Sequence, residues 1–194
     1  MLVFTRFLSG KGSYEGFDIV AHGIDWCRRR VTPRFPNFQF HCVSVRNDDY
    51  NPDGKSAASS FRFPYDDHSF DFVLLTSVFT HMVPADAEHY VAEIARVLRP
   101  GGRVFGTWFL LNGESRQLIA QGRSTLAFSH AIDGGMTIDA DVLGQAVAID
   151  EARVRAWYAK CSLAIDEPIR YGRWCGRAHF LTYQDVCVAR KAPG

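Results

Sequence analysis

Polar side chains with catalytic potential directly follow an apolar run near the middle of the chain. Phe70–Leu75 is almost continuously apolar, and Thr76, Ser77 and His81 come after it. A run of this kind suits a strand that is buried on both faces of a parallel sheet. Because open α/β sheets bind ligands beyond the carboxyl ends of their strands, these three side chains would border a reaction centre.

His81 is the candidate for proton transfer. Histidine is the side chain that most often serves as a general base, so His81 could take that role. It could equally shape a pocket or cap a helix, and a lone histidine is more often structural. The sequence leaves these interpretations open.

The elements that position these residues form one strand–helix–strand unit. Residues 84–98 follow a helical period, with Asp86 in the first turn and Arg96 near the end, as the helix dipole favours. Pro100 ends this helix, and a second apolar run covers residues 104–111. Such a succession is a right-handed crossover unit of an α/β sheet. The apolar face of the helix comprises Tyr90, Val91, Ile94, Val97 and Leu98.

Two stretches of this unit carry a resemblance to a known family. Residues 61–73 read FRFPYDDHSFDFV, and residues 96–103 read RVLRPGGR. Together, at this spacing, they resemble the approach to the fourth strand and the turn into the fifth strand of class I S-adenosylmethionine-dependent methyltransferases. The resemblance implies an α/β, Rossmann-like, doubly wound and mostly parallel sheet with an antiparallel last strand, formed by residues 1–194 as a single domain. It also implies S-adenosylmethionine as the cofactor and transfer of its methyl group to a small-molecule acceptor.

The same resemblance implies residues that bind the nucleoside of the cofactor. Residues 14–20 would be the second strand of the family, and Asp18 would accept hydrogen bonds from the ribose hydroxyls, because a carboxylate offers two acceptor oxygens to a vicinal diol. Ile19 would lie against the adenine. Alternatively, Asp18 caps the helix that follows.

Further cofactor contacts are implied after the third and fourth strands. A third strand is predicted over residues 38–45, and the polar residues that follow it, among them Asn47, are candidates to contact the adenine. Thr76 and Ser77 would hold the amino-acid part of the cofactor. Methyl transfer itself needs no base where the sulfonium carbon and the acceptor are held in line.

Candidate acceptor-binding residues lie on three later segments. Trp108 closes the fifth strand, and His130 lies within residues 123–149, where this family commonly inserts elements that cover the substrate. That segment is either a lid or a small hairpin that covers a sheet edge. Arg173 and Trp174 could touch an acidic or planar acceptor, although a packed connection between strands is the simpler alternative.

The first strand and glycine-rich loop of the family have no counterpart ahead of Tyr14. Gly10-Lys11-Gly12 is not a substitute, because it follows helical residues and precedes a strand, the reverse of the required order. We therefore expect a chain that begins inside the first helix of the family. The alternative function is a catalytically silent methyltransferase-like domain, or a truncated partner subunit, that does not bind the cofactor. A missing strand would expose a sheet edge, which predicts pairing with another copy or poor expression.

Composition argues against several classes of partner. The net charge is +1, and acidic and basic residues are interspersed, so the chain has no electrostatic footprint for nucleic acid or an anionic membrane. No apolar run is long enough to cross a bilayer. The five cysteines are far apart and lack metal-ligand spacing. We therefore expect reduced thiols in a cytoplasmic protein, and no metal site.

Overall fold

The computed structural model of this chain describes residues 2–194. Contacts divide the chain into two compact units, Met1–Ala57 and Ala58–Gly194. Each unit has a hydrophobic cluster of its own. None of the helices in the described residues has the length and apolar composition that a membrane crossing requires.

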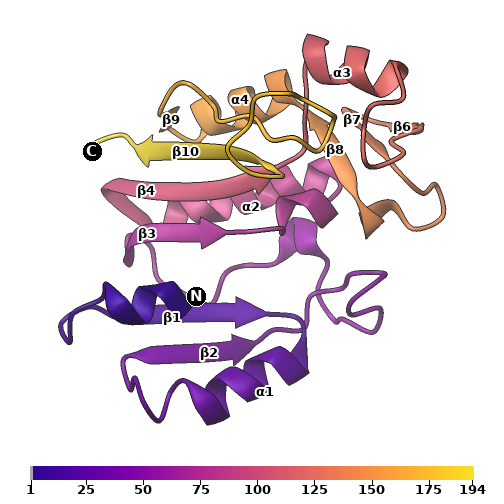
Figure 1. The fold of residues 1–194 in the computed structure, drawn as a ribbon. Helices are drawn as coiled ribbons and strands as arrows, with labels where there is room; N and C mark the ends of the chain where they lie inside the picture. The colour runs from indigo at the N-terminus through magenta and orange to yellow at the C-terminus, as the bar shows by residue number, and fades with distance from the viewer. Residues whose placement is uncertain (1) are drawn as a thin grey trace. The chain divides into compact units, whose positions relative to one another are not determined.

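The first unit is built on a two-stranded parallel sheet (Figure 1). β1 (Tyr14–Asp18) pairs with β2 (Phe38–Cys42), and α1 (Ala21–Arg30) makes the crossover between them. A short 3-10 helix, η1 (Leu2–Arg6), precedes β1. Ile24 of α1 is 4% exposed and packs into the core of this unit. The two predicted strands and the helix between them therefore exist, and the carboxyl ends of both strands lie at one edge of the sheet.

A four-stranded mixed sheet forms the centre of the second unit (Figure 1). β3 and β4 are parallel, as the crossover predicts, and β10 is antiparallel to both β4 and β9. The predicted antiparallel last strand is confirmed, and the sheet order β3-β4-β10-β9 places it inside the sheet. The strands are β3 (Phe70–Leu75), β4 (Leu98–Trp108), β9 (Leu163–Ile165) and β10 (Asp185–Lys191).

Two helices pack beside this sheet. α2 (Pro84–Val97) connects β3 to β4, and α4 (Glu151–Lys160) precedes β9. The five apolar residues predicted on one face of α2 are all buried. The helix ends one residue before the predicted end, because Leu98 already opens β4. The Pro-Gly-Gly turn lies within that strand as an irregularity in its pairing with β3, and Gly101 has a φ of 77°, which glycine adopts without strain.

A second sheet, of order β5-β8-β7-β6, follows β4 along the chain. β6 and β7 form an antiparallel hairpin, and β7 pairs with the edge of β8. Residues 123–149 therefore contain a hairpin that covers a sheet edge, one of the two structures their sequence allowed. The strands of this sheet and the helix between them are β5 (Leu110–Leu111), α3 (Gly113–Ala120), β6 (His130–Ile132), β7 (Gly135–Thr137) and β8 (Val147–Asp150). The second unit also contains the 3-10 helices η2 (Ala58–Ser60), η3 (Phe79–His81) and η4 (Leu143–Gln145).

Arg96 joins the two stretches that carry the family resemblance. Its guanidinium donates to the carbonyl oxygens of Phe63 and Tyr65 at 3.1 and 2.8 Å, and to the carboxylates of Glu93 and Asp67 at 2.7 Å each. Burial acts to raise the pKa of Glu93, but hydrogen bonds from Arg96 and from the backbone N–H of Phe63 lower it overall. The two stretches are thus one hydrogen-bonded unit, which explains why they occur together.

Candidate active site

Asp18 ends β1 and begins the connection to α1. Its side chain is exposed, and Oδ1 accepts a hydrogen bond from the backbone N–H of Val20 at 2.9 Å. Its carbonyl oxygen accepts from the N–H of Val43, just after β2, at 3.0 Å. Val20 is itself the N-cap residue of α1, so the Asp18 side chain closes a turn ahead of the helix and does not cap the N–H groups of the first turn. The carboxylate is therefore fixed at the carboxyl end of the first sheet.

Asn47 closes a turn of its own in the loop after β2. Its Oδ1 accepts hydrogen bonds from the N–H groups of Asp49 and Tyr50 at 3.0 and 2.9 Å. Ile19, the other predicted adenine neighbour, is partly buried beside Asp18. Because the oxygen of Asn47 is bound within the loop, a contact with adenine would use its amide nitrogen.

The chain after β3 is held by the two neighbouring strands. The N–H of Ser77 donates to Oγ1 of Thr107 on β4 at 2.8 Å. Its hydroxyl lies 3.2 Å from Oε1 and 3.0 Å from Nε2 of Gln184, the residue before β10. Thr76 and Ser77 are exposed at the carboxyl end of the sheet, where the sequence placed them, whereas the roles of Thr107 and Gln184 were not foreseen.

His81 lies in η3, close to that strand end. Its Nδ1 is 3.0 Å from the carbonyl oxygen of Gly144 in η4. Because a carbonyl oxygen only accepts hydrogen bonds, Nδ1 carries a proton, and a neutral His81 therefore has its lone pair on Nε2. The contact also ties the end of β3 to residues 123–149.

The two tryptophans predicted to contact an acceptor are core residues. Trp108 is 1% exposed and stacks on Phe79, with ring centroids 3.8 Å apart. Trp174 is 0% exposed and lies against Phe109 and Phe128. At this burial, either side chain would influence a ligand by shaping the surface above it.

Arg173 and His130 are exposed and make local contacts. The Arg173 guanidinium lies over the ring of Phe180, 5.5 Å from its centroid. His130 lies on β6, paired with Thr137 on β7. These contacts do not join the two residues to the end of β3, and their role in binding an acceptor stays a prediction.

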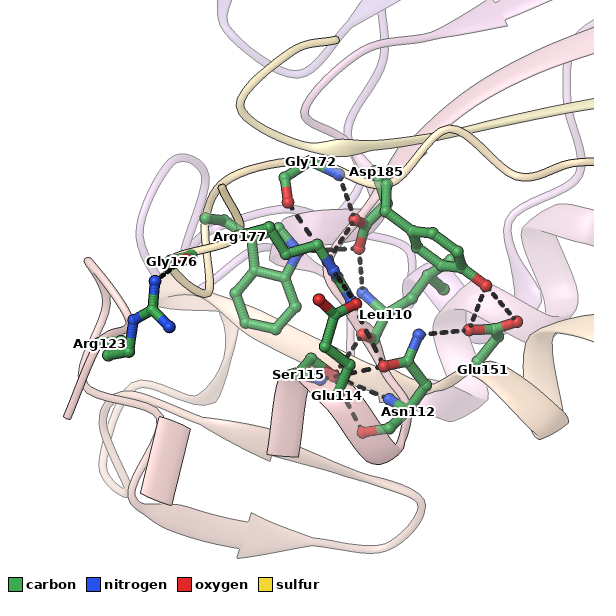
Figure 2. Close-up of polar contacts among 12 residues, drawn as sticks. Leu110, Asn112, Glu114, Ser115, Arg123, Glu151, Gly172, Gly176, Arg177 and Asp185 are labelled. Carbon is green, nitrogen blue, oxygen red and sulfur yellow. Dashed lines mark hydrogen bonds and ion pairs between the residues drawn. The ribbon is translucent and has the colours of Figure 1, made fainter. Parts of the chain in front are cut away.

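A buried carboxylate that the sequence did not indicate lies at the start of β10 (Figure 2). Asp185 is 0% exposed and accepts hydrogen bonds from the N–H groups of Leu110 and Gly172 at 2.7 and 2.6 Å, and from Nε1 of Trp174 at 2.8 Å. The Arg177 guanidinium is 3.2 Å from its Oδ1. Burial raises the pKa of Asp185 to about 6, and these hydrogen bonds oppose that rise.

Arg177 connects this carboxylate to α3 (Figure 2). Its guanidinium donates to Glu114 at 2.8 Å and to Asn112 at 3.3 Å, and Asn112 in turn donates to Glu151 at 2.9 Å. We call Asn112, Glu114, Glu151, Arg177 and Asp185 the Arg177 cluster. The polar groups of this cluster bind one another, so they join the segment around Arg177 to α3, α4 and β10.

Comparison with known proteins identifies the family. The family described as "Methyltransferase domain" matches residues 3–106, which is more than half of the chain. This chain belongs to the class I S-adenosylmethionine-dependent methyltransferases. The resemblance carried by residues 61–73 and 96–103 is therefore confirmed.

Relatives of this chain differ from it in length. The phthiotriol/phenolphthiotriol dimycocerosates methyltransferase of Mycobacterium tuberculosis is 38% identical over 90 residues, which are 46% of this chain and 26% of that protein. The match thus spans about a quarter of the relative. A solved protein of Pyrococcus horikoshii aligns with 97% of this chain and 76% of its own, at a TM-score of 0.60 and 17% identity. A second solved structure is the 1,6-didemethyltoxoflavin-N1-methyltransferase of Burkholderia thailandensis, with bound 1,6-didemethyltoxoflavin and S-adenosylhomocysteine. It aligns with 93% of this chain and 72% of its own, at a TM-score of 0.54 and 14% sequence identity. The two structures establish the Rossmann-like fold.

Two strand ends of this chain carry groups that suit parts of S-adenosylmethionine. The Val20 turn uses Oδ1 of Asp18, so Oδ2 of this exposed carboxylate suits a ribose diol. Ser77 offers a hydroxyl at the end of β3, a group that suits an amino acid. Among residues 2–194, no strand with a glycine-rich loop precedes β1, and no group of three or more His, Cys, Asp and Glu side chains could hold a metal ion.

Proposed function

We propose that this chain binds S-adenosylmethionine and transfers its methyl group to a small-molecule acceptor. The observation that carries the proposal is the exposed carboxylate of Asp18, fixed at the carboxyl end of β1 in a chain whose residues 3–106 match the methyltransferase family. Asp18 would accept hydrogen bonds from the ribose hydroxyls, Ile19 would lie against the adenine, and Asn47 would donate to it.

The second unit would hold the rest of the cofactor and the acceptor. Thr76 and Ser77 would bind the amino-acid part. When bound, the sulfonium of the cofactor supplies an activated methyl group. The chain would contribute alignment with the acceptor, which accounts for much of the rate enhancement in such transfers. Where the acceptor must lose a proton, Nε2 of His81 is the candidate base, because Nδ1 donates to Gly144.

The acceptor would lie against the elements that follow β4. Arg173 and His130 are exposed and could touch it, whereas Trp108 and Trp174 would shape its surroundings through packing. The name of the Mycobacterium tuberculosis relative includes the word phthiotriol, which denotes a triol, so an acceptor screen starts with alcohols. All five cysteines are free thiols, which supports the proposal of a cytoplasmic location.

Calorimetric titration with S-adenosylhomocysteine tests the proposal. We expect binding to the unsubstituted chain, and an affinity about 10- to 100-fold lower for Asp18→Ala, because hydrogen bonds to a charged group are lost. Asp53→Ala removes an exposed carboxylate of the same unit and is the matched control. Equal affinities for Asp18→Ala and Asp53→Ala would contradict the role of Asp18.

A second candidate function is a silent methyltransferase-like domain or partner subunit. A folded chain that does not bind S-adenosylhomocysteine would support this candidate. Light scattering on the same sample tests the predicted pairing of copies through a sheet edge, which a monomer would contradict.

A further inference from the structure

Ser77 has a left-handed backbone conformation although it is not glycine. Its φ is 55°. For a residue with a Cβ this conformation costs energy and persists only where the surrounding structure holds it. Such residues gather at ligand sites, so the position of each one in the sheet is informative.

Three residues other than glycine have a positive φ in the described part of the chain, and Ser77 differs from the others in position. His68 and Ser162 come just before β3 and β9, the amino ends of these two strands. β9 runs in the same direction as β4, because β10 is antiparallel to both. Ser77 is therefore the one that lies at the carboxyl end of the sheet, where open α/β sheets bind ligands.

Two uncharged side chains hold Ser77 in this conformation. Thr107 is 7% exposed and accepts the N–H of Ser77 at 2.8 Å. Gln184 binds the Ser77 hydroxyl through both atoms of its carboxamide, at 3.2 and 3.0 Å. The register pairs Asp185 with Trp108, so Gln184 lies beside the end of β4. Gln184 and Ser77 are 107 positions apart in the chain. We call Ser77, Thr107 and Gln184 the Ser77 clamp.

We propose that Gln184 and Thr107 are positioning residues of the cofactor site. They hold the Ser77 hydroxyl and the backbone around it in the arrangement that receives the amino-acid end of S-adenosylmethionine. The inference rests on the proposed function and adds the last strand of the second unit to the cofactor site. Because no member of the clamp carries a charge, its effect on affinity is constant between about pH 6 and pH 9.

Titration with S-adenosylhomocysteine, paired with thermal unfolding, tests the clamp. Gln184→Leu keeps the size of the side chain and removes its polar atoms. We expect an affinity about 3- to 10-fold lower, the usual effect of a lost hydrogen bond, with an unchanged unfolding temperature. Gln117→Leu makes the same chemical change at an exposed position of α3 and is the matched control, expected to bind as the unsubstituted chain does.

Ser77→Gly separates positioning from stability. Glycine adopts a φ of 55° without strain, so the unfolding temperature should stay the same or rise, while the affinity falls at least as much as in Gln184→Leu. The double variant Ser77→Gly/Gln184→Leu should bind no more weakly than Ser77→Gly alone, because both substitutions remove the same contact.

The outcomes distinguish this inference from the proposed function. Absence of binding by the unsubstituted chain would overturn the proposed function and the clamp with it. Binding by the unsubstituted chain, together with equal affinity for Gln184→Leu, would overturn the clamp alone. A parallel fall of affinity and unfolding temperature in Ser77→Gly would also overturn it, because the contact would then be merely structural.

Discussion

Two arginines of the second unit each bind several groups, and they differ in the kind and distance of their partners. Arg96 binds the carbonyl oxygens of Phe63 and Tyr65, and its most distant partner in the chain is 33 positions away. Arg177 binds Glu114 and Asn112, which are 63 and 65 positions away. The first arginine belongs to a stretch that resembles the family, and the second lies in the connection between β9 and β10.

The difference shows what a short stretch of sequence can encode. Arg96 binds two backbone carbonyl oxygens and the carboxylates of Glu93 and Asp67, and all four groups belong to one crossover unit and the segment that leads into it. Arg177 needs particular side chains on distant segments, among them Glu114 and Asp185. We expect both arginines to stabilise the second unit, and we expect their partners to differ in how well they tolerate substitution.

The largest effect is expected for Asp185→Asn. Each carboxylate oxygen accepts at least two hydrogen bonds, so the amide nitrogen of asparagine would face donors whichever way it turns. We expect a loss of about 4 kcal/mol in the free energy of unfolding. Denaturant unfolding at pH 7.5 measures it through tryptophan fluorescence, because three of the four tryptophans lie in the second unit.

Asp133→Asn is the control for that substitution. Its side chain is 89% exposed and pairs with Arg153 at the surface. We expect a change within about 0.5 kcal/mol. Similar losses for the two variants would show that the Arg177 cluster does not stabilise the unit.

Arg96→Met is expected to have the next largest effect. The substitution leaves the buried Glu93 without its cation and the carbonyl oxygen of Tyr65 without its Arg96 donor, whereas the carbonyl of Phe63 keeps the N–H of Tyr65. We expect a loss of about 3 kcal/mol, measured by the same unfolding experiment. A loss below about 1 kcal/mol would mean that the crossover unit keeps its geometry without this arginine.

The acid sensitivity of the Arg96 contacts should be visible in Glu93→Gln. The pKa of Glu93 is lowered in the fold, so the unfolded chain takes up its proton first as the pH falls. The stability that ionised Glu93 adds is therefore present above its ordinary pKa, about 4.3, and is lost as the pH falls through the lowered value. We expect the unsubstituted chain to exceed Glu93→Gln by about 1 kcal/mol at pH 7 and by less at pH 3.5. A difference that grows on acidification would contradict this sign.

The smallest effect is expected for Arg99→Met. Arg99 is three positions from Arg96 and lies 2.6 Å from Asp71, but the side chains of both partners are exposed, at 49% and 82%. Exposed ion pairs contribute little, so we expect a change of about 0.5 kcal/mol or less. A loss of unfolding free energy equal to that of Arg96→Met would contradict the expectation that, within residues 96–103, buried contacts stabilise the fold more than exposed ones.

Elements with a long, regular pattern could be predicted from the sequence. β3 spans the predicted residues 70–75, and α2 ends within one residue of its prediction, because each has a bounded apolar pattern. β5 and β6 contain two and three residues, too few for any periodicity to show. The hairpin in residues 123–149 could therefore be offered only as one of two alternatives.

Some residues of the candidate site could likewise be predicted from the sequence, and others could not. Asp18 and Ser77 lie at strand ends, where the order of elements placed them. Gln184 and Asp185 could not be found, because their partners are set by the antiparallel pairing of β10 with β4. A glutamine just before a strand and an aspartate at its first position carry no local signal of such contacts.

The position of β10 between β4 and β9 has a consequence for folding during synthesis. β10 comes last among the strands, yet it is the neighbour that both β4 and β9 require. Until residues 185–191 leave the ribosome, β4 has a partner on one side only, and the carboxylate of Asp185 is not yet available to Leu110. Such long-range pairing is slow, and unpaired strands are prone to aggregation. The central sheet of the second unit is therefore complete only after β10 has been synthesised.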